Sequence, residues 1–70
     1  MPEISPEVKK FLEDLGASIE AAKADLKKAQ ELIKIGEEMG FDVTEQKKRQ
    51  EELLERIKKM EEVREKYLKG

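Results

Sequence analysis

The stretch that decides the fold runs from Ser18 to Met39 and reads SIEAAKADLKKAQELIKIGEEM. In and just before it, large apolar residues recur at intervals of seven, namely Leu12, Ile19, Leu26 and Ile33. A second series with the same interval lies three residues further along the chain, namely Leu15, Ala22, Ala29 and Gly36. Together the two series have the alternating spacing of three and four that forms a seam between helices. The small residues Ala22, Ala29 and Gly36 predict close packing of a neighbouring helix.

The remainder of the chain predicts a helical hairpin around this stretch. Gly40 suits the left-handed residue that ends a helix, and Thr44 suits the cap that begins the next one. We therefore expect helices over about 18–39 and 45–69, with a short loop at 40–43 that joins antiparallel neighbours. The fold class is all-α, and residues 1–70 form a single helical domain because so short a chain has room for only one small core.

Folding the hairpin about its loop also predicts which residues face one another. With equal rise on both helices, residues whose numbers add up to about 84 lie opposite each other. This register places Leu26 against Ile57 and Leu32 against Leu53. The apolar face of the last helix comprises Leu53, Leu54, Ile57, Met60, Val63, Tyr67 and Leu68.

The amino-terminal segment allows two arrangements. After a short leader at 1–4, Ser5 and Pro6 predict the start of a helix over about 6–15. Gly16 then either ends that helix as a left-handed cap or lies inside one long helix, since the seven-residue series passes through it without a shift. A straight helix would overhang the hairpin and expose Val8, Phe11 and Leu12. We therefore favour a break at Gly16 and a three-helix bundle, with a hairpin that assembles into a larger bundle as the alternative.

The half of the hairpin nearest the loop suggests an interaction surface. The stretch TEQKKRQEE at 44–52 contains no apolar residue, whereas the opposite helix is at its most apolar there. We expect part of that apolar face to remain uncovered. Together with the first segment, the candidate interface comprises Val8, Phe11, Leu12, Leu32, Ile35, Met39 and Phe41.

Composition excludes several classes of function. Charged residues make up 46% of the chain, but 17 acidic residues nearly balance 15 basic ones, so no global field favours nucleic acid or an anionic membrane. No apolar run approaches the length of a membrane span, and the first residues lack the apolar region of a signal peptide. We expect a soluble protein without a targeting signal, cytoplasmic if it is expressed in a cell.

Candidate chemistry is sparse. The chain contains no histidine, cysteine or tryptophan, and its hydroxyl residues are mostly expected helix caps. Because there is no histidine, we interpret glutamate pairs such as Glu37 with Glu38 as part of a solvated surface and not as a metal site. We therefore expect no enzymatic activity, no cofactor, no metal and no small-molecule substrate.

The basic run Lys47, Lys48 and Arg49 opposes the helix dipole, and it either contacts an acidic partner or pairs with nearby glutamates on a solvated surface.

The strong helix start at Ser5 to Glu7, the connector at 40–44 and the Glu/Lys-rich surface from Glu51 to Lys59 resemble computationally designed or idealised helical bundles. That resemblance implies a structural scaffold and carries no functional motif.

The expected partner is a second copy in a homodimer, or else another protein. In the dimer, the first segment of each chain lies over the loop-proximal face of the other, with two-fold symmetry. The alternative function is a binding module that presents Leu32, Ile35, Met39 and Phe41 to a partner helix or groove.

Overall fold

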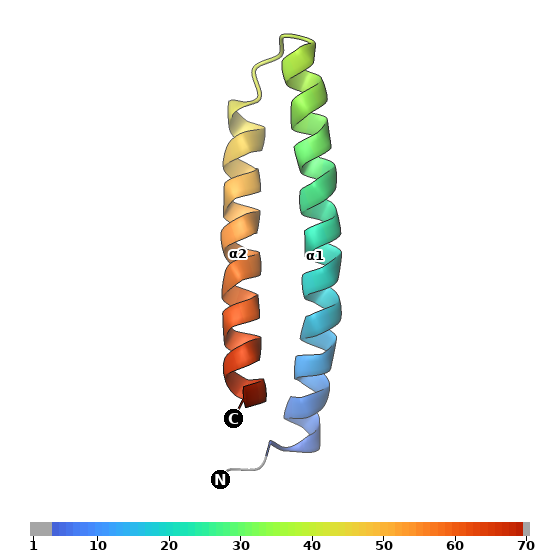
Figure 1. Ribbon diagram of the computed structural model, residues 1–70, viewed down its shortest axis with the longest axis vertical. Coiled ribbons are helices and arrows are strands. Elements are labelled where there is room, and N and C mark those ends of the chain that lie inside the picture. Colours follow the sequence, from blue (N-terminus) through green and yellow to red (C-terminus); the bar gives the residue numbers. More distant parts are fainter. Residues whose placement is uncertain (1–3, 70) are drawn as a thin grey trace.

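The computed structural model describes residues 4–69, and these form two antiparallel helices that lie side by side (Figure 1). Helix α1 spans Pro6–Glu38, helix α2 spans Thr44–Lys69, and residues 39–43 join them at one end. The described chain contains no strand, and it measures 56 × 15 × 14 Å. The predicted all-α hairpin is thus confirmed. Of the expected leader at 1–4, all but Ile4 lies outside the described residues.

Both ends of α1 follow from local sequence. The hydroxyl of Ser5 accepts a hydrogen bond from the amide of Val8 at 3.2 Å, while Pro6 fills the first helical position, where no amide is needed. At the other end, Gly40 adopts a φ of 80°, which places it in the left-handed region. The amide of Phe41 then donates to the carbonyl of Gly36 at 2.9 Å and closes the last turn. The expected glycine cap is present.

The expected break at Gly16 is wrong, because α1 is one continuous helix of 33 residues. The separate helix over 6–15 and the three-helix bundle built on it are therefore absent from the described chain. Gly16 instead makes room for a side chain of α2: a Cβ atom at this position would lie 2.9 Å from Nη2 of Arg64. The Nε of Arg64 donates to the carbonyl of Leu12 at 2.8 Å, one turn before Gly16. The glycine thus serves close packing and not helix termination.

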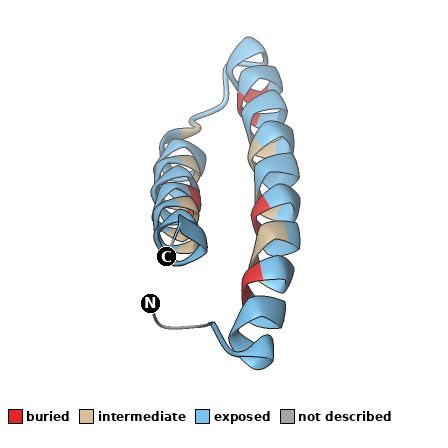
Figure 2. Ribbon diagram, turned by 60° about the horizontal axis from the view of Figure 1, so that its bottom comes forward, coloured by how far each residue is buried: buried red, intermediate tan, exposed pale blue. Residues whose placement is uncertain are grey.

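The seam between the helices is where the core lies (Figure 2). The buried large apolar residues are Leu12, Ile19 and Ile33 of α1 and Ile57 of α2. Of the three small residues expected on the seam, Gly36 is buried, and Ala22 and Ala29 are half-buried. Leu12 is only 3% exposed, so the expectation that a straight first helix exposes it is wrong. It belongs to the seam because it lies seven residues before Ile19.

Two ion pairs between the helices agree with the expected register. Lys23 Nζ lies 2.8 Å from Glu61 Oε2, and Lys47 Nζ lies 3.0 Å from Glu37 Oε2. The residue numbers of each pair add up to 84, so both helices advance at the same rate along the seam. Leu32 was expected both opposite Leu53 and in the candidate interface, and its side chain is 69% exposed, so it lies beside the seam and not in it. Leu32 precedes the buried Ile33 and is therefore rotated by about 100° around the helix axis.

Candidate interaction surface

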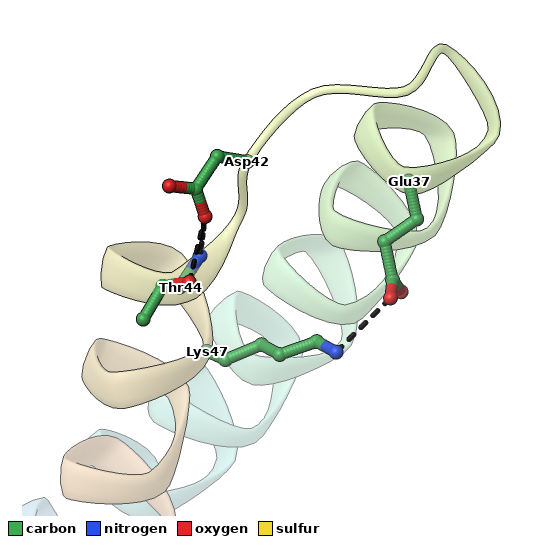
Figure 3. A network of polar contacts seen from close by, with 4 residues as sticks. All are labelled: Glu37, Asp42, Thr44 and Lys47. Atoms are coloured by element: carbon green, nitrogen blue, oxygen red, sulfur yellow. Dashed lines mark hydrogen bonds and ion pairs between the residues drawn. The ribbon is translucent and has the colours of Figure 1, made fainter.

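The connector is held by a polar cluster that fixes the start of α2 (Figure 3). Asp42 Oδ1 accepts hydrogen bonds from the amide of Thr44 at 3.0 Å and from its hydroxyl at 2.6 Å. These hydrogen bonds stabilise the carboxylate and lower the pKa of Asp42. Thr44 was expected to accept amide hydrogen bonds as the cap, but its hydroxyl donates to Asp42. The helix accordingly begins at Thr44, one residue earlier than expected.

Part of the basic run after the connector pairs across the hairpin. Lys47 reaches Glu37 near the end of α1, so its partner lies on the other helix and not one turn further along α2 (Figure 3). Both side chains of the pair are about half exposed. Arg49, two residues further on, lines an apolar groove beside this end of α1. Lys47 and Arg49 therefore lie on two different sides of the hairpin.

That groove is the largest concave feature among those described, with a volume of about 550 Å³. One wall is formed by exposed apolar residues that we call the loop-end cluster, namely Leu32, Ile35, Met39 and Phe41. The other wall comes from polar positions of α2, among them Gln46, Arg49 and Gln50. The groove exists because this half of α2 offers no apolar side chain until Leu53, as the stretch 44–52 indicated.

A second apolar surface lies near the start of α1. Val8 is 44% exposed and Phe11 is 63% exposed, and we call these two residues the amino-end cluster. Of the seven candidate interface residues, Leu12 alone is buried, so it is unavailable to a partner. Because no helix among residues 4–69 folds back over the hairpin, Val63 and Tyr67 of α2 also remain exposed.

Sequence reasoning missed Arg64, which provides the main polar contact across the open end of the hairpin. The available signal was its position, because Arg64 follows Ile57 by seven residues and thus falls on the seam itself. It borders a shallow groove of about 290 Å³ that also contains the Lys23–Glu61 pair. The hydrogen bond with Glu61 stabilises the ammonium and raises the pKa of Lys23. This opposite flank of the hairpin is polar and internally paired.

Among residues 4–69, no group of three or more acidic side chains is arranged to hold a metal ion. Neither described helix is long and apolar enough to cross a membrane. Comparison with protein-family models, curated proteins and solved structures finds no match to this chain. The exposed apolar clusters of α1 are thus the features from which a function can be argued.

Proposed function

We propose that this chain is a non-catalytic structural hairpin that associates with copies of itself through exposed apolar faces of α1. The observation that carries the proposal is the balance of apolar surface. Four large apolar residues are buried in the seam, whereas the two clusters of α1 and its connector leave six exposed. A single core in a chain of this size rarely supplies more than about 3–5 kcal/mol, so covering these clusters is the source of further stability that we propose. The resemblance to idealised helical bundles supports the same interpretation.

The size of the clusters sets the expected strength of association. Fully burying a large apolar side chain contributes roughly 1.5–3 kcal/mol, and these side chains already start about half buried. Six residues per chain would then contribute on the order of 6 kcal/mol, or about 12 kcal/mol for two chains. Association itself costs an estimated 4–15 kcal/mol. We therefore expect a reversible dimer of moderate affinity and not an obligate one.

Sedimentation velocity or light scattering at micromolar to millimolar concentration tests the proposal. We expect the mass to rise above the 8.1 kDa of one chain as concentration increases. Phe11→Glu and Met39→Lys should each shift association to higher concentration, because each places a charge on an exposed apolar cluster. A strict monomer throughout this range would refute self-association.

Gln30 provides a matched control. It is exposed on α1 and borders the polar flank with Lys34 and Glu37. Gln30→Glu and Gln30→Lys introduce the same charges on the same helix away from both clusters. We expect neither to change the association. If they weaken it as much as the cluster variants do, net charge and not apolar contact controls the mass.

The loop-end groove favours one other function, a module that binds a partner helix through Leu32, Ile35, Met39 and Phe41. This alternative predicts a monomer whose groove binds an apolar probe such as anilinonaphthalene sulfonate. The double variant Ile35→Glu/Met39→Lys should then lose probe binding and keep its helical circular dichroism. Loss of folding in the double variant would instead mean that these residues support the core.

A further inference from the structure

The exposed side of α1 carries a second pair of seven-residue series, which the seam within the hairpin does not use. One series contains Phe11, Ser18, Asp25, Leu32 and Met39. The other contains Glu7, Asp14, Ala21, Lys28 and Ile35. All ten residues are exposed, and their alternating spacing of three and four places them on one continuous stripe along the helix. We call these ten residues the outer stripe.

We propose that a second copy of the chain docks antiparallel along the outer stripe, with the two-fold axis crossing α1 at Ala21 and Ala22. This inference rests on the proposed self-association and specifies its orientation and register. In such a dimer, residues that are equally far from the axis lie opposite each other, because both helices have the same rise per residue.

The apolar residues at the two ends of α1 match in this register. Phe11 lies ten residues before Ala21, and Leu32 lies ten residues after Ala22. Phe11 of each chain therefore lies opposite Leu32 of the partner chain. At 63% and 69% exposure, they are the two most exposed large apolar side chains among the described residues. Val8 and Ile35 are likewise equidistant from the axis, so the amino-end cluster of one chain lies over the loop-end groove of the other.

The charged residues of the outer stripe match as well. Asp14 lies seven residues before Ala21 and Lys28 lies six residues after Ala22, so Asp14 and the partner's Lys28 differ in level by one residue, or about 1.5 Å, and the carboxylate lies within reach of the ammonium. Near the axis, the hydroxyl of Ser18 falls opposite the carboxylate of Asp25. The Ala21 side chains of the two chains lie next to the axis, one residue apart in level, where only a small residue permits two helices to approach closely.

The groove supplies one more complementary pair. Because Lys47 pairs with Glu37, Arg49 lies at about the level of Ile35 on α1. In the proposed register, this level coincides with Glu7 and Val8 of the partner. The carboxylate of Glu7 would then approach the guanidinium of Arg49, which lines the groove. This contact gives the basic run after the connector an acidic partner in a second copy.

Other registers of the same stripe are less favourable. Sliding the partner by one heptad moves the axis by half a heptad, and an axis at Ser18 places Phe11 against the carboxylate of Asp25. Sliding the partner by one heptad in the other direction moves the axis to Asp25 and places two Asp25 carboxylates against each other. A parallel dimer would align each residue with itself and bring together like charges at Asp14, Asp25 and Lys28, which is repulsive.

Spin-label distances distinguish these arrangements, because the chain has no cysteine of its own. Glu13, Lys27 and Lys34 are exposed on α1 away from the outer stripe, and each accepts a single nitroxide through a substitution to Cys. With the axis between Ala21 and Ala22, the label separations along the helix are about 26 Å for Glu13→Cys, 17 Å for Lys27→Cys and 38 Å for Lys34→Cys. The shortest distance is thus expected at 27 and the longest at 34.

Each alternative gives a different order of these distances. An axis at Ser18 makes the distance at 13 the shortest, and an axis at Asp25 makes the distance at 13 the longest. A parallel dimer gives similar distances at all three sites. Any of these results would overturn the register while leaving self-association in place. A monomer at the highest concentration, with no dipolar signal, would overturn both.

A charge exchange provides an independent test. Asp14→Lys and Lys28→Asp should each raise the dissociation constant of the dimer roughly tenfold, because each replaces two attractive contacts by two repulsive ones. The double variant Asp14→Lys/Lys28→Asp should recover the original affinity. The two positions are about 21 Å apart on one helix, so they can compensate each other only across the dimer. A double variant that stays as weak as the single variants would refute the proposed pairing.

Discussion

Replacing Gly16 by alanine tests whether the helix keeps a glycine there to accommodate Arg64. Alanine is the better helix former by about 1 kcal/mol, so an unobstructed Gly16→Ala variant should be stabilised by that amount. The new Cβ atom would lie 2.9 Å from Nη2 of Arg64, so the guanidinium has to shift, and we expect this shift to break its hydrogen bond to the carbonyl of Leu12. A hydrogen bond to a charged group contributes about 1.5–3 kcal/mol, and the lower end applies because Arg64 is only half-buried. We expect a net destabilisation of about 0.5 kcal/mol.

A double-mutant cycle with Arg64→Ala isolates this effect. Without the guanidinium, Gly16→Ala should recover its full gain of about 1 kcal/mol, which gives a coupling energy of about 1.5 kcal/mol. Urea unfolding followed by circular dichroism at low micromolar concentration measures each free energy of unfolding. Ala17→Gly, at the neighbouring exposed position, calibrates the helix propensity in both backgrounds. Equal effects of Gly16→Ala with and without Arg64 would refute the reasoning.

Three further predictions concern the loop end. Gly36→Leu should destabilise the hairpin by roughly 1–3 kcal/mol through overpacking, since even a Cβ atom would lie 3.0 Å from Val43 Cγ1, and thermal unfolding measures the loss. Gly40→Ala should cost about 1 kcal/mol in the same assay purely through its φ of 80°, because nothing lies within 4 Å of the added Cβ atom. The lowered pKa of Asp42 predicts that its carboxylate stabilises the fold above about pH 4 and loses this contribution as the pH falls through the lower folded-state pKa. Acid titrations of wild type and Asp42→Ala should therefore differ most above pH 4 and converge in strong acid, and parallel curves would contradict this.

The seam and the loop could be predicted because their signals are local or periodic. The seven-residue series places Ile19 and Ile33 on one side of a helix whatever they contact, and Gly40 marks the turn by its backbone freedom alone. Gly16 could not be settled in the same way. A glycine suits both a helix end and a close contact, and the contact that decides it comes from Arg64, far along the chain.

The exposure of the candidate interface residues was predicted with one error, Leu12, that has a physical reason. Exposure of Phe11 and Leu32 follows from their positions beside the seam and not on it. Leu12 belongs to the candidate interface because a straight first helix is expected to project beyond the last helix of the hairpin. Arg64 reaches back along the seam to the carbonyl of Leu12, and Leu12 remains buried at this end of the hairpin.

The single loop of the hairpin also sets an order in which its contacts can form. Contacts beside the connector, such as Lys47 with Glu37, enclose only a few residues and need little loss of chain entropy. The hydrogen bond from Arg64 to Leu12 joins residues 52 positions apart, so it encloses nearly the whole molecule. Since the described residues form no third helix to bridge the ends, assembly from the loop outward avoids closing that long loop in one step. The open end is then the last part to form and the first to fray, and the Arg64 contact is placed where it limits that fraying.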